Sequence, residues 1–305
     1  MLPEGNYTLN DTIVITKPVT IIGTGFATQL YMKNNKTMFQ FVNVNNSAIR
    51  DVYLGSASTT GHLIEFIGGG HNQINNVTML GGNYGLHLYG SLLNTIIDLR
   101  SGTNFQGFFA PTSINNTWVM AERNPTTNIS SNANTFIAPV LEGGKNGIVI
   151  NDGNGQGSLQ IMGGSIEGVS ATGLTIQNTF LPSSITGVHF EANGQDINIQ
   201  NASNIRMTAI LSVSTPTTAN PSIISLTGDT RNVQITDSIV STLQADPSTK
   251  RIMLQNITFG TGTCSNLALN VPAATSSTIA IGSNGVLDTS TNITAVNVGN
   301  YCGGQ

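Results

Sequence analysis

Short β-branched runs recur along the whole chain, separated by clusters of Gly and Asn. One recurring unit reads Gly, apolar, variable, apolar, and it occurs at residues 85–88, 147–150 and 173–176, with a related unit lacking the Gly at 196–199. A second unit begins with Asn and occurs at residues 75–79, 94–97, 115–119, 204–207 and 232–235. Alternating apolar and polar residues over such short runs predict half-buried strands, and no segment has a helical period long enough to predict a helix.

A repeat of roughly 20–30 residues made of short strands and turns is typical of a parallel β-solenoid. Each coil would lie about 4.8 Å from the next, with an apolar column inside and rows of side chains outside. Asn suits the corners, because it tolerates left-handed backbone and its amide can hydrogen-bond to the next coil. A β-sandwich is the competing architecture, but the Asn-Gly hairpin turns that it favours are scarce here.

Composition supports the stacked arrangement and excludes several classes of protein. Only 9% of residues are charged, against about 25% in a typical domain, and like charges would repel if they stacked from coil to coil. A mean hydropathy of +0.06 excludes charge-driven disorder. With 11 basic and 15 acidic residues, nucleic acid is not an expected partner. No apolar run is long enough to span a membrane, so no membrane partner is expected either.

The first coil carries a recognisable pattern. Residues 2–9 read LPEGNYTL, a short strand follows at 13–15, and an apolar strand at 19–22 leads into Gly23-Thr24-Gly25. This pattern resembles the N-terminal coil of the pectate-lyase-like right-handed β-helix superfamily, which includes phage tailspikes and polygalacturonase-related proteins. The resemblance implies an all-β, single-stranded right-handed parallel β-helix of about ten coils over residues 1–260. Residues 261–305 are less regular and are expected to form terminal coils or a C-terminal cap.

The start of the chain lacks the basic and apolar segments of a signal peptide. Because it begins abruptly within a strand-and-turn pattern, we expect a leader or an N-terminal domain to have been removed. The two cysteines, Cys264 and Cys302, either form one disulfide or remain as buried thiols. The chain has no CxxC motif and no Cys/His spacing typical of structural zinc.

The resemblance is uninformative about activity, because the superfamily contains lyases, hydrolases, epimerases and non-catalytic spikes. The Asn-x-Asp, Asp-Asp and Gly-His-Gly motifs of polygalacturonases are absent. Calcium-dependent pectate lyases place an acidic cluster opposite an Arg. Here Arg206 and Arg231 lie one coil apart without a tight Asp cluster. We therefore predict no metal site and no cofactor; the fold would allow a bound Ca²⁺, but no motif indicates one.

Three glutamates repeat at the coil spacing and are the candidate catalytic carboxylates. Glu142, Glu167 and Glu191 lie 25 and 24 residues apart, and each follows an apolar residue by six positions: Phe136, Ile161 and Ile185. Stacked at about 4.8 Å, they could form a catalytic or cation-binding groove, with His189 as an acid–base partner of Glu191. The alternative is that each glutamate accepts hydrogen bonds from backbone amides of a neighbouring turn.

Four further residues are candidates for substrate binding. Glu65 and His87 would lie in adjacent coils if the Gly-apolar units align, either as a cooperating pair or as a surface pair without a role. Trp118 could stack against a sugar, and Arg206 lies in the Arg pair described above. The aromatic cluster near Trp118 either binds sugar or fills the core: Tyr84, Tyr89, Phe105, Phe108 and Phe109. Three other acidic residues fit no pattern: Asp98, Glu122 and Asp152.

These patterns lead to two functional hypotheses. The first is an extracellular polysaccharide-binding β-helix, which as an enzyme would be a polysaccharide hydrolase or lyase. The second is a non-catalytic structural or adhesive spike of a virion or an extracellular appendage, for which a homotrimer is expected. The first follows mainly from the resemblance, since a polymer of repeating sugars suits a surface whose side chains repeat.

Overall fold

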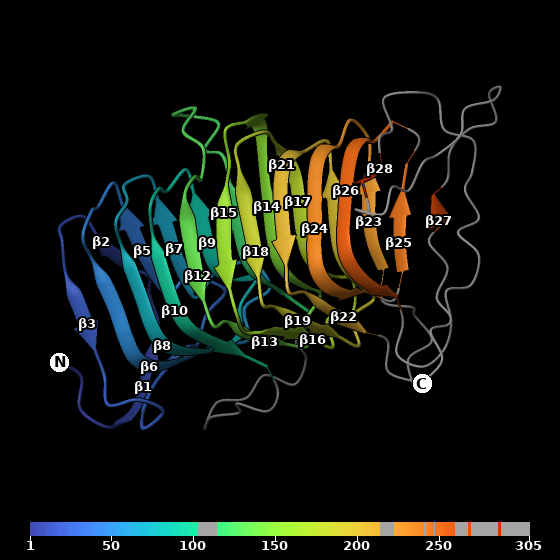
Figure 1. Cartoon of the computed structure of the whole chain (residues 1–305). Helices are drawn as coiled ribbons and strands as arrows, with labels where there is room; N and C mark the ends of the chain where they lie inside the picture. Colours follow the sequence, from blue (N-terminus) through green and yellow to red (C-terminus); the bar gives the residue numbers. More distant parts are fainter. Residues whose placement is uncertain are drawn as a thin grey trace.

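The computed structural model describes residues 1–102, 115–213, 223–240, 242–246 and 248–259, and the short strands at 268–269 and 286–287. These residues form an all-β parallel solenoid of about nine turns (Figure 1). The expected parallel β-helix is therefore confirmed, with about nine turns rather than ten. No helix occurs among the described residues, and hence none that could cross a membrane. The proposed C-terminal cap and both cysteines fall outside the described residues, apart from the two short strands.

Strands of successive coils pair in parallel to form an 11-stranded sheet along one side of the solenoid. In chain order, these strands are β2 (Ile13–Ile15), β5 (Phe39–Val42), β7 (Ile64–Ile67), β9 (Tyr84–Tyr89), β11 (Thr117–Glu122), β14 (Asn146–Gly155), β17 (Thr172–Thr179), β20 (Gln195–Gln200), β23 (Ile223–Thr227), β25 (Thr242–Ala245) and β27 (Ala268–Leu269).

The rest of each coil belongs to a 17-stranded sheet and has two parts, a long leg and a short leg, which meet at a corner. The strands of this sheet are β1 (Gly5–Leu9), β3 (Thr20–Ile22), β4 (Thr28–Met32), β6 (Ala48–Ser56), β8 (Gln73–Gly81), β10 (Thr95–Ser101), β12 (Asn134–Ile137), β13 (Val140–Glu142), β15 (Leu159–Met162), β16 (Ser165–Glu167), β18 (Ser183–Thr186), β19 (His189–Glu191), β21 (Ser203–Thr208), β22 (Leu211–Val213), β24 (Arg231–Val240), β26 (Lys250–Phe259) and β28 (Val286–Leu287). All pairings between these strands are parallel except that of β28 with β26. In some coils the two legs are separate strands, as with β12 (long leg) and β13 (short leg); in others they are the two halves of one bent strand, as in β10.

The register between coils stacks like residues on like. On the long leg, one inward position forms a continuous column of buried apolar side chains: Ile49, Ile74, Ile96, Phe136, Ile161, Ile185, Met207 and Ile235. The apolar residues that precede the three glutamates by six positions in the sequence are thus members of this inward column: Phe136, Ile161 and Ile185. Full burial of each such side chain contributes about 1.5–3 kcal/mol.

A left-handed residue bends each coil between the long and the short leg. This corner is Asp51, Asn76 and Asp98 in β6, β8 and β10, and Ala138, Gly187 and Ala209 in later coils, with φ between 49° and 66°. The side chain of Asn76 donates to Asp51 Oδ1 at 2.7 Å, so the corners of successive coils are hydrogen-bonded to one another. Eight of the eighteen described non-glycine residues with positive φ are Asn, as the sequence predicted for corners.

A buried asparagine ladder joins the coils at another corner. The side-chain oxygen of Asn72 accepts the backbone N–H of Ser47, that of Asn94 accepts the N–H of Asn72, and that of Asn134 accepts the N–H of Asn94. Each of the three amides is about 1% exposed. The ladder supplies acceptors for backbone donors that would otherwise be buried without partners.

One Asn-led unit lies in a different sheet from the others. Residues 115–119 resemble the Asn-led units, but the strand within them belongs to the 11-stranded sheet, where Val119 pairs with Leu86 and Ile148. Asn precedes strands at more than one corner, so it does not identify which leg follows. The units at 94–97, 204–207 and 232–235 lie on the long leg, and the unit at 75–79 spans the corner at Asn76 and continues into the short leg. The Gly-led units all lie in the 11-stranded sheet.

We expect Asn94→Ala to lower the free energy of unfolding by about 2–4 kcal/mol, because it leaves the buried N–H of Asn72 without an acceptor and removes the amide that donates to the Ser91 hydroxyl. Urea unfolding measures this loss. Asn35→Ala, at an exposed position, is the matched control and should change stability by about 0.5 kcal/mol or less. Equal stabilities for the two variants would contradict a supporting role for the ladder.

Candidate functional site

The three predicted glutamates form a continuous row on the short leg. Glu142 pairs with Glu167 across β13 and β16, and Glu167 pairs with Glu191 across β16 and β19. The middle residue of each strand points into the core and is fully buried, so the glutamates point outward. Side chains in adjacent coils therefore begin about 4.8 Å apart. The spacing deduced from the sequence brings these residues together as expected.

His189 lies within the same row. Its Nδ1 is 3.7 Å from Glu167 Oε1, and its Nε2 is 3.7 Å from Glu191 Oε2. The three side chains are each 33–34% exposed, so solvent and a ligand can reach them. One imidazole thus lies between two carboxylates that belong to successive coils. Such an arrangement can both donate and accept a proton.

The alternative role of the glutamates, as acceptors for backbone amides, finds no support at Glu167 and Glu191. The N–H of Gly143 donates to the backbone carbonyl of Glu167, and the N–H of Gly168 donates to that of Glu191. Among the described residues, no backbone amide donates to the carboxylate of Glu167 or Glu191. The turn amides are satisfied by main chain, which leaves those two carboxylates to face solvent and His189.

Trp118 lies beneath this row rather than on the surface. It is 1% exposed, and its indole N–H donates to the carbonyl of Gly143 at 2.8 Å, in the turn that follows Glu142. A Cβ added to Gly144 would lie 3.1 Å from that indole nitrogen, so the turn fits closely over the ring. The structure therefore contradicts the predicted stacking of Trp118 against a sugar. The ring fills the core and supports the turn beside the glutamates.

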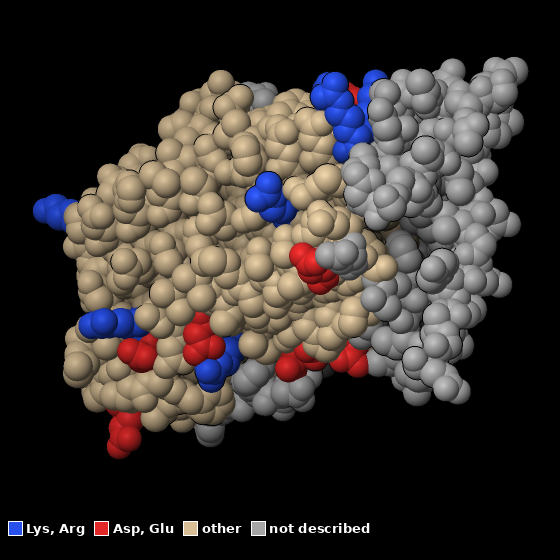
Figure 2. All heavy atoms as spheres, viewed as in Figure 1, with Lys and Arg blue, Asp and Glu red and all other residues tan. Residues whose placement is uncertain are grey.

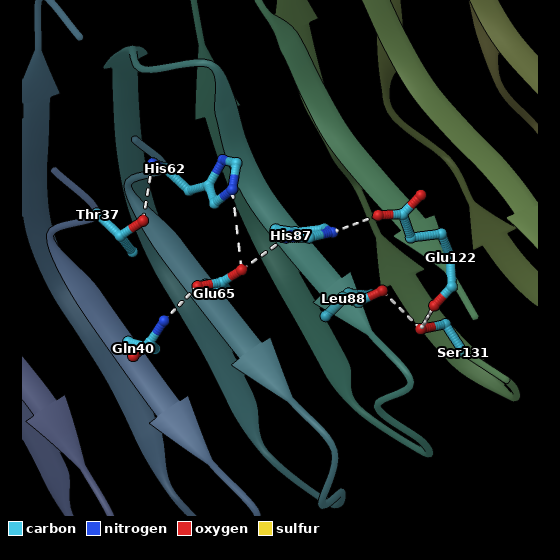
Figure 3. A network of polar contacts seen from close by, with 8 residues as sticks. All are labelled: Thr37, Gln40, His62, Glu65, His87, Leu88, Glu122 and Ser131. Carbon is cyan, nitrogen blue, oxygen red and sulfur yellow. Dashed lines mark hydrogen bonds and ion pairs between the residues drawn. The ribbon is translucent and has the colours of Figure 1, made fainter. Parts of the chain in front are cut away.

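A second cluster lies on the outer face of the 11-stranded sheet (Figure 3). Gln40, Glu65 and His87 occupy paired positions in β5, β7 and β9. Gln40 Nε2 donates to Glu65 Oε2 at 2.8 Å, Glu65 Oε1 is 2.9 Å from His87 Nδ1, and His87 Nε2 is 2.9 Å from Glu122 Oε1. The predicted adjacency of Glu65 and His87 is thus observed, as one part of a chain of polar contacts.

Aromatic rings pack around His87. The ring of His62 stacks on Tyr84 with centroids 4.7 Å apart, and it lies 4.8 Å from the ring of His87. Tyr84 and Tyr89 lie 5.0 and 5.2 Å from His87. The rings reduce the access of water, and the side chains of Glu65 and His87 are only 10% and 7% exposed.

Burial and hydrogen bonding shift the acidities of this cluster in opposite directions. Burial, followed by the charge of His87, lowers the pKa of His62 to about 4, so this imidazole is neutral at pH 7. Burial alone would lower the pKa of His87, but its hydrogen bonds to Glu122 and Glu65 outweigh that effect and raise it. Burial likewise opposes ionisation of Glu65, yet hydrogen bonds from His87 and Gln40 lower its pKa overall. Perturbed groups of this kind gather at functional sites.

Sequence reasoning missed His62 and saw no pattern around Glu122. A signal for His62 was present, because the alignment that pairs Glu65 with His87 also brings His62, three residues earlier, level with Tyr84. Glu122 gave no such signal, because 35 residues separate it from His87, much more than one regular coil. The longer interval contains residues 103–114, which lie outside the described part of the chain.

The remaining candidates do not join either cluster. Arg206 is exposed on β21 and donates to Gln234 of the next coil at 3.2 Å. Asp98 forms an ion pair with Arg100 at 2.7 Å. Asp152 is buried and accepts the N–H of Gln156 at 2.5 Å. Phe105, Phe108 and Phe109 fall outside the described residues.

Solved structures with this fold include enzymes, phage proteins and an adhesin. The A-module of mannuronan C-5 epimerase AlgE4 from Azotobacter vinelandii matches with a TM-score of 0.60 and 13% identity, over 89% of this chain and 88% of that one. ORF18 of Geobacillus virus E2 matches with a TM-score of 0.62 and 14% identity, over 86% and 54%. The Streptococcus pneumoniae surface adhesin PfbA matches with a TM-score of 0.56 and 11% identity, over 88% and 83%.

At these identities, the likeness establishes the fold alone. The chain has the parallel β-helix fold, which is the fold that the resemblance of its first coil implied. No protein-family model matches the sequence, and no curated protein matches it either. What the protein does must therefore be argued from its own residues.

The core position of Trp118, which is the only tryptophan in the chain, can be tested by fluorescence. We expect acrylamide to quench the native emission only weakly, because the indole is 1% exposed, and to quench it strongly in urea. Added polysaccharide should leave the native quenching unchanged. Efficient quenching of the folded protein would place the ring at the surface and restore the sugar-stacking role.

Proposed function

We propose that the protein binds an extracellular polysaccharide along the outside of the solenoid and cleaves it at the row formed by Glu142, Glu167, His189 and Glu191. The observation that carries this proposal is the half-exposed imidazole of His189, 3.7 Å from a carboxylate oxygen in each of two successive coils. The epimerase A-modules with the same fold are named for a polysaccharide, mannuronan, which makes this class of ligand reasonable.

The spacing of the row suits the cleavage of a glycosidic bond. Retaining hydrolysis requires two carboxyl groups about 5–5.5 Å apart, close to one coil step, and inverting hydrolysis requires about 6.5–9.5 Å, close to two steps. Glu167 and Glu191 can therefore provide a nucleophile and an acid, or Glu142 and Glu191 can flank a water molecule. A lyase would instead use His189 as the base that removes a proton next to a carboxylate of the sugar.

The charge of the row suggests which polymers bind. Three stacked carboxylates repel a polyanion, and the whole chain carries a net charge of −4. Much of the visible face of the solenoid is uncharged (Figure 2). Elsewhere its amides form rows, as where Gln177 donates to Gln200 at 2.8 Å. We therefore expect a hydroxyl-rich neutral polysaccharide and hydrolysis, rather than a polyuronate such as mannuronan and elimination next to its carboxylate.

A panel of neutral and acidic polysaccharides tests the proposal directly. New reducing ends would indicate hydrolysis, and new ultraviolet absorbance from unsaturated products would indicate a lyase. We expect Glu167→Gln to lower turnover by about 10²–10⁴-fold, as the loss of a general acid or base does, while binding is retained. Glu4→Gln, the same substitution at an exposed site outside the row, is the control and should keep full turnover. Unchanged turnover in Glu167→Gln would refute the assignment.

The alternative function is that of a non-catalytic adhesive or structural spike at a virion or cell surface. The self-contained polar network of Gln40, Glu65, His87 and Glu122 favours it, because ladders of this kind also stabilise a solenoid. The likeness to the adhesin PfbA is compatible with it. This alternative expects binding without products and the mass of a trimer in solution. Product formation by a monomer would exclude it.

A further inference from the structure

We propose that His62, Glu65 and His87 form a site for one divalent transition-metal ion of the Zn²⁺ type. This goes beyond the polysaccharide proposal, which uses a different row of residues. It also departs from the sequence-based expectation of no metal site. The ligand atoms of these three side chains, one from each, all lie within 4.8 Å of one another.

The geometry is close to that of a bound ion. Glu65 Oε1 is 2.9 Å from His87 Nδ1 and 3.8 Å from His62 Nε2, so one carboxylate oxygen faces both imidazoles. Zinc bonds of about 2.0–2.2 Å in a tetrahedral arrangement separate the ligand atoms by roughly 3.4 Å. The observed distances fall on either side of that value, and a small rotation of the partly exposed His62 ring brings the three atoms around a common centre.

Outer hydrogen bonds hold the two buried ligands in position. Glu122 accepts a hydrogen bond from Nε2 of His87, which leaves Nδ1 facing Glu65. Gln40 donates to Oε2 of Glu65, which leaves Oε1 facing the two rings. A carboxylate on the far nitrogen of a ligating histidine, and a hydrogen bond to the free oxygen of a ligating carboxylate, are the usual supports of metal ligands.

The imidazole of His62 lacks partners that a buried ring would normally have. Its Nδ1 is buried without a hydrogen-bond partner among the described residues, and its Nε2 is too far from Glu65 for a hydrogen bond. A cation would give Nε2 a strong partner, and the proton of the ring would then lie on Nδ1, which has no acceptor among the described residues. The cation would also take the place of the proton that His87 shares with Glu65, so that binding releases one proton.

A second His/Glu group among the described residues is a weaker candidate. Glu167, His189 and Glu191 also offer ligand atoms within 4.8 Å. Their side chains are about one-third exposed, however, and both nitrogen–oxygen distances are 3.7 Å. Two imidazoles and one carboxylate select Zn²⁺ and its neighbours, whereas two carboxylates on an open surface favour hydration of the ion. The row therefore serves as an internal control.

The test is metal uptake by the full chain after treatment with a chelator and dialysis. We expect isothermal titration with Zn²⁺ to show one ion bound per chain, and Co²⁺ to give the visible absorption of a tetrahedral site. Glu65→Gln and His62→Asn should abolish binding, and Glu122→Gln should weaken it by about 10–100-fold, as the loss of an outer partner does. Glu167→Gln, the same substitution in the other group, should bind as the parent does.

Circular dichroism and urea unfolding establish that each variant is folded. If Glu65→Gln does not fold, His62→Asn decides the question, because the His62 side chain is partly exposed. Absence of Zn²⁺ and Co²⁺ uptake by the parent chain, or undiminished uptake by folded His62→Asn, would overturn the inference. So would loss of uptake in Glu167→Gln alone, which would place the ion at the row instead. No polysaccharide enters this measurement, so its outcome is independent of the proposed function.

Discussion

The parallel pairing of each coil with the next is the constraint on which the rest of the structure depends. Main-chain hydrogen bonds fix the register, and a fixed register places every side chain next to its counterpart one coil away. The same rule produces the buried apolar column, the asparagine ladder and the row of glutamates. A shift of one residue in any strand would turn the column outward, so the core enforces the register that the surface rows require.

This constraint explains why so much could be predicted from sequence. Stacking turns a distance along the chain into a distance in space, so Glu142, Glu167 and Glu191 could be brought together from their spacing alone. The same logic paired Glu65 with His87. It fails where a coil is longer than its neighbours, and for that reason Glu122 was not recognised as a partner of His87. It also fails for a residue such as Trp118, because whether its side chain points into the core depends on which sheet its strand belongs to.

The scarcity of charge gives the two polar clusters their significance. In a chain with 9% charged residues, each carboxylate that lies beside an imidazole is an exception to the stacking of neutral side chains. One cluster is enclosed by rings and by its own hydrogen bonds, and the other is open to solvent. The enclosed cluster has the fixed geometry that suits an ion, and the open row has the access that suits a polymer. A single fold can thus present two chemically different polar clusters on different faces.

The uneven length of the coils has a consequence for how such a protein can diversify. Asn94 and Asn134 are neighbours in the ladder although 40 residues separate them, whereas only 22 separate Asn72 from Asn94. Residues 103–114 of this interval lie outside the described residues, and the described chain on either side keeps its pairing: Gly102 lies against Glu142, and β10 pairs with β12. Coils of very different length can therefore follow one another in the stack without loss of the parallel pairing. A lengthened coil could therefore carry residues that recognise a new ligand, while the pairing of the solenoid strands stays unchanged.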